Sequence, residues 1–111
     1  MSIIWYNLGE GMQYRIIKTP EYQKWLENET KKSVVQIEDR MSKIEAEGHF
    51  GTHKNLGDEI WELKWQGGRR IYFAYIPECR VLLLLGGNKN GQDKDIQKSK
   101  KIFRKYVEIE A

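Results

Sequence analysis

The apolar run Val81–Leu85 constrains the fold more than any other feature of this 111-residue sequence. A strand with one solvated face alternates apolar and polar residues, whereas an unbroken apolar run suits an interior strand that is covered on both faces. The run is also far too short for a membrane-spanning helix, which needs roughly 20 residues. The sequence therefore predicts a sheet that is covered on both sides, and it predicts no membrane segment.

Three other segments have the composition of strands. Residues 14–18 are rich in β-branched and aromatic side chains. Residues 60–65 alternate apolar and polar side chains, and a Gln-Gly-Gly connection leads from them into a return strand over residues 69–76. We expect a second hairpin around Pro77 and a loop over the polar residues 49–58. In the strand over residues 60–65, Trp61, Leu63 and Trp65 lie on one face, with Glu62 and Lys64 on the other. In the return strand Arg70 and Tyr72 lie on one face and Ile71 and Phe73 on the opposite one.

Helix signals stand on both sides of these strands. Thr19 and Pro20 supply an N-cap and a proline at the first helical position. A second helix, with an apolar stripe at helical spacing, is expected to end at Gly48. The last helix is expected over residues 92–107, after a flexible turn at residues 86–91. Its inward face is expected to consist of Ile96, Phe103, Tyr106 and Val107.

These elements follow the order β-α-α-β-β-β-α, which defines an α+β fold with helices packed on a mainly antiparallel sheet. The length suits one domain, so we expect a single domain over residues 1–111, with an N-terminal extension at 1–13 and a core at 14–107. The N-terminus lacks the features of a signal peptide, and the single cysteine, Cys79, suits a reducing compartment. We therefore expect a cytoplasmic protein.

The charge distribution favours an anionic partner. The net charge is +3 and the pI is about 8.9, and lysine and arginine residues are concentrated in the second half of the chain. His49 and His53 lie in the expected loop without a third metal ligand, and residues 86–91 lack the Gly-Lys-Ser/Thr ending of a nucleotide-binding loop. We expect neither a metal nor a cofactor.

Five phrases, in order along the chain, carry a resemblance to a known family. They are Thr19-Pro20-Glu21-Tyr22 with Trp25-Leu26, Lys54-Asn55-Leu56-Gly57-Asp58 with Trp61-Glu62-Leu63, Arg70-Ile71-Tyr72-Phe73, Leu83-Leu84-Leu85-Gly86-Gly87-Asn88-Lys89, and Gln92 with Lys94, Asp95 and Ile96. On these phrases, residues 14–106 resemble the RelE/ParE superfamily, and within it the HigB-like, phage Gp49-like addiction-module killer proteins.

The resemblance implies the toxin of a type II toxin–antitoxin system, which enters the ribosomal A site and cuts messenger RNA. It also implies a cognate antitoxin, often a helix-turn-helix DNA-binding protein, that holds the toxin inactive. Where the family commonly has Glu-Leu-Arg, this chain has Glu62-Leu63-Lys64, which replaces a planar bidentate phosphate clamp by a point charge. Residues 1–13 are extra to the family core, as an added edge strand or a partner contact.

RNA cleavage without a metal requires deprotonation of a 2′-hydroxyl, in-line attack on the adjacent phosphate, stabilisation of the growing charge and protonation of the leaving oxygen. Cationic side chains can serve these needs, and we expect Lys54, Arg70 and Lys89 to converge on one sheet face. In this hypothesis Arg70 clamps the phosphate, Lys89 offsets transition-state charge and Lys54 acts as proton donor or base. Weaker candidates for substrate contact are His53, Lys64, Arg69, Gln92 and Lys94.

Two other functions stay open at this point. A ParE-like toxin inhibits DNA gyrase on the same fold, and fold alone does not determine function. The presence of Arg70 and Lys89 in the HigB-like phrases favours RNA over gyrase. A non-catalytic, phage-derived nucleic-acid-binding protein is harder to exclude because of Lys64, and it would show salt-sensitive RNA binding without cleavage.

Overall fold

The computed structural model describes residues 13–110, which form five strands, three α-helices and one short 3-10 helix. In chain order the elements are β1 (Arg15–Lys18), α2 (Pro20–Glu27), α3 (Lys31–Glu47), β2 (His53–Gly57), β3 (Ile60–Lys64), β4 (Arg69–Ile76), β5 (Arg80–Asn88), η1 (Lys89–Gly91) and α4 (Gln92–Glu110). The predicted extension at residues 1–13 lies outside the described residues except for Gln13.

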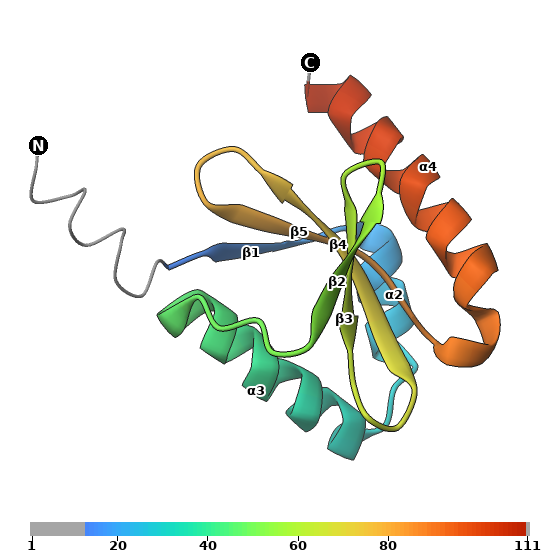
Figure 1. Ribbon diagram of the computed structural model, residues 1–111. Helices are drawn as coiled ribbons and strands as arrows, with labels where there is room; N and C mark the ends of the chain where they lie inside the picture. The colour runs from blue at the N-terminus through green and yellow to red at the C-terminus, as the bar shows by residue number, and fades with distance from the viewer. Residues whose placement is uncertain (1–12, 111) are drawn as a thin grey trace, which may run out of the picture.

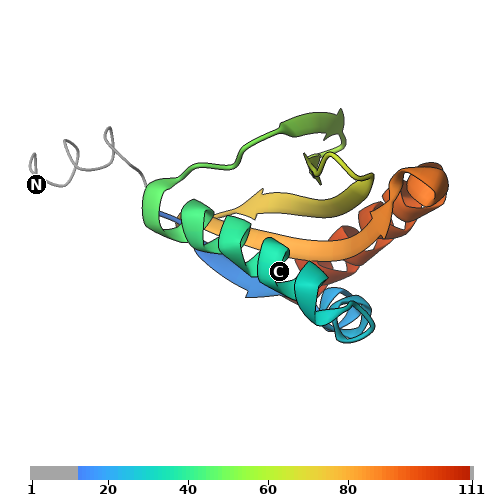
Figure 2. The same cartoon turned by 90° about the horizontal axis from the view of Figure 1, so that it is seen from below.

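The five strands form one sheet in the order β1-β5-β4-β3-β2. β1 pairs with β5 in parallel, and the other neighbours are antiparallel. Helices α3 and α4 lie on opposite sides of the strands (Figure 1), and α3 runs lengthwise along the sheet (Figure 2). The predicted α+β fold with helices on a mainly antiparallel sheet is confirmed.

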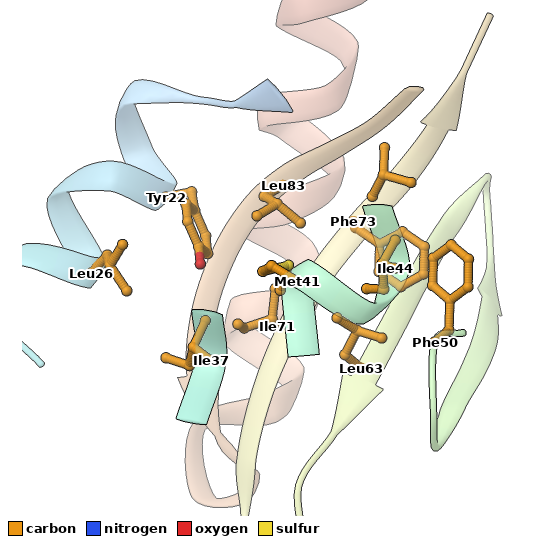
Figure 3. Close-up of a cluster of buried hydrophobic side chains, with 11 residues drawn as sticks. Tyr22, Leu26, Ile37, Met41, Ile44, Phe50, Leu63, Ile71, Phe73 and Leu83 are labelled. Atoms are coloured by element: carbon orange, nitrogen blue, oxygen red, sulfur yellow. The ribbon is translucent and has the colours of Figure 1, made fainter. Parts of the chain in front are cut away.

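Two apolar clusters fill the space between the sheet and its helices. On one face, Tyr22 and Leu26 of α2 and Ile37 of α3 join side chains of the sheet (Figure 3). On the other face, Ile102 and Phe103 of α4 are the buried residues of the helix side. The run Val81–Leu84 contributes to both clusters and is fully buried, as predicted for an interior strand.

Thr19 joins the first helix to the sheet. Its hydroxyl oxygen accepts a hydrogen bond from the Tyr22 amide at 3.1 Å, which caps α2 as predicted. The same hydroxyl donates a hydrogen bond to the Leu83 carbonyl at 2.8 Å. Its own amide donates to the same carbonyl at 3.1 Å. Pro20 follows at the first helical position, where its missing N–H costs no hydrogen bond.

The glycine pair at the end of β5 lets two helices approach the sheet from opposite sides. A Cβ on Gly86 would lie 2.3 Å from the Trp25 ring of α2, and a Cβ on Gly87 would lie 2.1 Å from the Asp95 carboxylate of α4. Neither distance is possible for real side chains. The two glycines therefore determine where the first turn of α4 meets the sheet.

The segment over residues 49–58 is not wholly a loop, because His53–Gly57 form the edge strand β2. The residues of this strand are mostly polar and exposed, and they lack the alternation of apolar and polar side chains by which a strand is predicted from sequence. Its position depends on distant partners: β3 pairs along it, and Arg40 of α3 donates hydrogen bonds to the Phe50 and Thr52 carbonyls just before it.

Two further boundaries differ from the prediction. β5 continues through Asn88, so the expected turn at residues 86–91 is shorter, because β4 pairs with Gly86 and Gly87 in register. α4 extends to Glu110, and Val107 is 45% exposed instead of facing inward. The inward positions of α4 are instead those that continue the spacing of three and four from Ile96, namely Ser99, Ile102, Phe103 and Tyr106.

Candidate active site

Strand register places a set of polar and charged side chains on the sheet face that α4 covers. Lys54 of β2 pairs with Glu62 of β3, which pairs with Tyr72 of β4. On the next rung, Lys64 pairs with Arg70. Paired residues of antiparallel strands project from the same face, and Tyr72 packs in the cluster beneath α4. All five side chains therefore belong to this face.

Glu62 lies at the centre of this set and is fully buried. One carboxylate oxygen, Oε2, accepts a hydrogen bond from the Gln92 side-chain amide at the start of α4. The other, Oε1, lies 4.0 Å from Nε of Arg70. The carboxylate therefore contacts a neighbouring strand and the first residue of the last helix at the same time.

The Arg70 guanidinium is held at the start of β4, next to the turn that leads from β3. Its Nη1 donates to the carbonyl of Trp65 at 3.2 Å and to that of Arg69 at 2.9 Å, and only 12% of the side chain is exposed. Together with the Glu62 ion pair, these contacts restrict the guanidinium on two of its edges. Arg70 is a preorganised cation rather than a freely rotating surface charge.

Lys89 lies beside the turn that precedes Arg70. Its amide donates to the Gly68 carbonyl at 2.8 Å, and its side chain crosses Gly68 so closely that a Cβ there would lie 3.5 Å from Cδ of Lys89. Gly68 has a φ of 106°, which L side chains rarely adopt. Gln92 and Lys94 follow in the first turn of α4, so the chain brings both close to the same end of the sheet.

Burial changes the acid–base properties of two groups at this site. Desolvation raises the pKa of Tyr72, and the nearby Glu62 and Asp95 carboxylates raise it further. Burial likewise raises the pKa of Asp95, against the opposing effect of Lys98 and Lys94. The phenol of Tyr72 is therefore neutral, with its proton retained, far into the alkaline range.

Three buried polar atoms of the cluster have no hydrogen-bond partner among residues 13–110. They are Oε1 of Glu62, Nε of Arg70 and the hydroxyl of Tyr72. Buried polar atoms are nearly always paired in folded proteins, and the exceptions are found at strained or functional sites. Their concentration around one carboxylate marks this face as the candidate active site.

Two of the predicted substrate contacts lie on the opposite face. The His53 ring packs near Phe50 and Trp61, with centroid distances of 5.6 and 5.7 Å, on the face that α3 covers. Arg69 donates to Gln36 of α3 at 3.1 Å. The structure thus brings together Lys54, Lys64, Arg70, Lys89 and Gln92 at one face or its end, and it separates His53 and Arg69 from them. Lys94 is exposed in the first turn of α4, away from the inward side of that helix.

Sequence reasoning gave Glu62 and Asp95 no role in this site. The sequence did contain a signal for Glu62. Its carboxylate stands between the apolar residues Trp61 and Leu63, in a segment with the composition of a strand. The burial of Tyr72 and Asp95 depends on the packing of α4 against Gly87, which local patterns do not reveal.

This face carries cationic side chains and the Gln92 amide together with the Glu62 and Asp95 carboxylates. Over residues 13–110, no three histidine, cysteine, aspartate or glutamate side chains come together as a metal site. Within the same residues, none of the helices has the length and apolar character needed to cross a membrane. The arrangement suits the binding of a phosphate group through Arg70 and the lysines around it.

Comparison with known proteins identifies the family. The family model described as Phage derived protein Gp49-like matches residues 23–107. A protein of Haemophilus influenzae with no assigned function is 33% identical over 92 residues, which cover 80% of this chain and 92% of the relative.

Solved structures share the fold at low sequence identity. A double mutant of the Escherichia coli toxin RelE in the free state matches with a TM-score of 0.66 and 16% identity, covering 82% of this chain and 99% of that chain. The RelBE2 toxin–antitoxin complex of Mycobacterium tuberculosis matches with a TM-score of 0.59 and 13% identity over 70% of this chain and all of that chain (100%). The intact E. coli RelBE toxin–antitoxin complex matches with a TM-score of 0.58 and 15% identity over 68% and 95% of the two chains. The chain therefore belongs to the phage-derived Gp49-like family and has the RelE fold, as the resemblance predicted.

Proposed function

We propose that this protein is the toxin of a toxin–antitoxin pair and that it cuts messenger RNA at the ribosome without a metal ion. The observation that carries the proposal is the placement of Lys54, Lys64 and Arg70 on one sheet face. Lys89 lies at the end of the same face, and Lys94 is exposed in the first turn of the nearby α4. Family membership and the RelE fold support the toxin assignment. Because its substrate is translated RNA, the protein acts in the cytoplasm.

The proposed reaction needs only protein side chains. A base removes the proton of a 2′-hydroxyl, the resulting oxygen attacks the adjacent phosphorus in line, and the bond to the 5′-oxygen breaks, which leaves a cyclic phosphate and a 5′-hydroxyl. Arg70 binds the phosphate, and Lys89 offsets the charge that develops on it. Lys54 serves as the base or as the acid that protonates the leaving oxygen.

An antitoxin is the proposed partner. Two of the solved structures with this fold are complexes of a toxin with its antitoxin. A partner that covers the cationic face with acidic side chains would block RNA by steric exclusion and by charge neutralisation. We propose a small helix-turn-helix DNA-binding protein encoded beside this chain, which the neighbouring reading frame will reveal.

The experiment compares Arg70→Ala with Arg69→Ala after induced expression. The two arginines are adjacent in sequence, but only Arg70 lies on the proposed catalytic face, since Arg69 bonds to Gln36 on the other. Growth is followed together with primer extension on cellular messenger RNA. We expect wild type and Arg69→Ala to arrest growth with ribosome-dependent cuts, and Arg70→Ala to lose both.

Each other outcome points to a different function. Growth arrest with intact messages would favour gyrase inhibition over RNA cleavage. RNA binding without cuts or arrest would favour a non-catalytic nucleic-acid-binding protein. Loss of activity in both arginine variants would mean that the face assignment is wrong.

A further inference from the structure

Glu62 is a buried carboxylate that the proposed reaction does not use. Its rung neighbours are Lys54 and Tyr72, and its partner at ion-pair distance within residues 13–110 is Arg70. Burial of an ionised carboxylate is costly unless opposite charges and hydrogen bonds compensate for the lost water. Because Glu62 is buried beside the cations of the site, we looked for a role of its carboxylate other than packing.

The two carboxylate oxygens serve two different elements. Oε2 accepts from the Gln92 amide of α4, and Oε1 faces Nε of Arg70 on β4 at 4.0 Å. The opposite edge of the guanidinium, at Nη1, is held by the Trp65 and Arg69 carbonyls. Glu62 therefore places a carboxylate oxygen at ion-pair distance from the edge of the guanidinium that these two carbonyls do not contact.

We propose that Glu62 is a positioning residue, which aligns Arg70 and Gln92 for the scissile phosphate before RNA arrives. The inference rests on the proposed function, in which Arg70 binds that phosphate. Alignment in advance removes reorganisation from the reaction step, where a small displacement of a catalytic group is costly. The Oε1 to Nε gap is longer than a hydrogen bond, and such contacts often shorten when substrate binds.

The carboxylate also has an electrostatic effect that distinguishes positioning from packing. In the free protein its negative charge offsets the mutual repulsion of Lys54, Lys64 and Arg70. In the complex the same charge repels the RNA phosphate. Removal of the charge without a change of shape should therefore slow the chemical step while RNA binding is retained or becomes tighter.

The test is Glu62→Gln, which keeps the shape and an oxygen for Gln92 but loses the charge. We expect kcat for ribosome-dependent cleavage to fall about 10²-fold, with KM unchanged or lower. Glu62→Asp keeps the charge and should retain more activity. The matched control is Glu38→Gln, because Glu38 lies on α3 in an exposed pair with Lys18.

A second readout does not depend on cleavage. The NMR signal of the Arg70 Nε–H group, identified by its loss in Arg70→Ala, should shift and exchange faster with solvent in Glu62→Gln but not in Glu38→Gln. If wild type cuts RNA and Glu62→Gln cuts it equally well, the positioning role is wrong and the proposed function stands. If wild type cuts no RNA, the proposed function fails, and an unchanged Arg70 signal in Glu62→Gln then overturns the positioning role as well.

Discussion

Arg69 and Arg70 are neighbours in the sequence, yet β4 directs them to opposite faces of the sheet. Arg69 bonds to Gln36 of α3, while Arg70 faces the buried Glu62 beneath α4. One arginine therefore ties the sheet to a covering helix, and the other belongs to the candidate active site. Positive charge can therefore be removed from either face of the sheet separately, and the effects on RNA binding can be compared.

The salt dependence of RNA binding should depend on the face from which a lysine is removed. Lys89→Gln and Lys94→Gln should each reduce the slope of log K against log salt by about 0.7, the value for one phosphate contact on a single strand. Lys43→Gln should leave the slope unchanged, because Lys43 lies on α3 and pairs with Asp39 at 3.2 Å. Titration of a labelled single-stranded RNA at several salt concentrations measures the slopes, and equal slopes for all three variants would contradict the proposed binding face.

Gly86→Ala should destabilise the protein by about 1–3 kcal/mol, the usual cost of overpacking. The added Cβ would lie 2.3 Å from the Trp25 ring, so α2 must move away from β5. Gly67→Ala is the control, because an added Cβ there meets nothing within 4 Å. Urea unfolding gives both free energies, and equal stability of the two variants would show that Trp25 yields without cost.

Thr19→Val should lower the free energy of unfolding by about 1–2 kcal/mol, which is the range for loss of a helix N-cap. The variant removes the acceptor for the Tyr22 amide and the hydroxyl that contacts the Leu83 carbonyl. Thr19→Ser retains the hydroxyl and should remain close to wild type. Thermal unfolding followed by circular dichroism measures the difference, and a Val variant as stable as wild type would show that the hydroxyl contributes nothing to stability.

Stability should fall as the pH rises above about 10, the ordinary pKa of tyrosine, because burial raises the pKa of Tyr22 and of Tyr72. In this range the unfolded chain loses phenolic protons that the folded protein keeps, so that the folded state binds more protons and is progressively disfavoured. Tyr72→Phe should reduce the slope by about 1.4 kcal/mol per pH unit.

The same variant should cost little at neutral pH, since the Tyr72 hydroxyl has no hydrogen-bond partner within residues 13–110. Urea unfolding at pH values from 7 to above 10 tests both statements. A slope equal to that of wild type would mean that the phenol ionises in the folded protein as it does in the unfolded chain.

Local chemistry was sufficient to predict most of the fold. Thr19 and Gly48 determine the beginning of α2 and the end of α3 through backbone hydrogen bonds and a left-handed φ of 67°, which are properties of short segments. The interior strand β5 was predictable because only a strand covered on both faces tolerates an unbroken apolar run. β2 was not predictable, since its polar residues become a strand only through β3 and the Arg40 contacts.

The candidate site was predictable to the extent that it follows from strand alternation. Alternation alone separates Arg69 from Arg70, which the substrate assignment did not use, whereas the β3–β4 register is needed to place Lys64 beside Arg70. Alternation also places Glu62 with Lys64 on its strand, but it does not reveal that Glu62 is buried or that Gln92, thirty positions later in the chain, donates a hydrogen bond to it.

The N-cap of α2 bonds to a strand that is 65 positions away, and within residues 13–110 β1 pairs with that strand alone. Closure of so long a loop has an entropic cost that is recovered only after β4 and β5 have paired as a local hairpin. Folding should therefore proceed from the second half of the chain, with β1 and α2 docking late onto a preformed meander. In the folded protein the same order in reverse should let β1 open before the central strands, so that its amides exchange with solvent before those of β4 and β5.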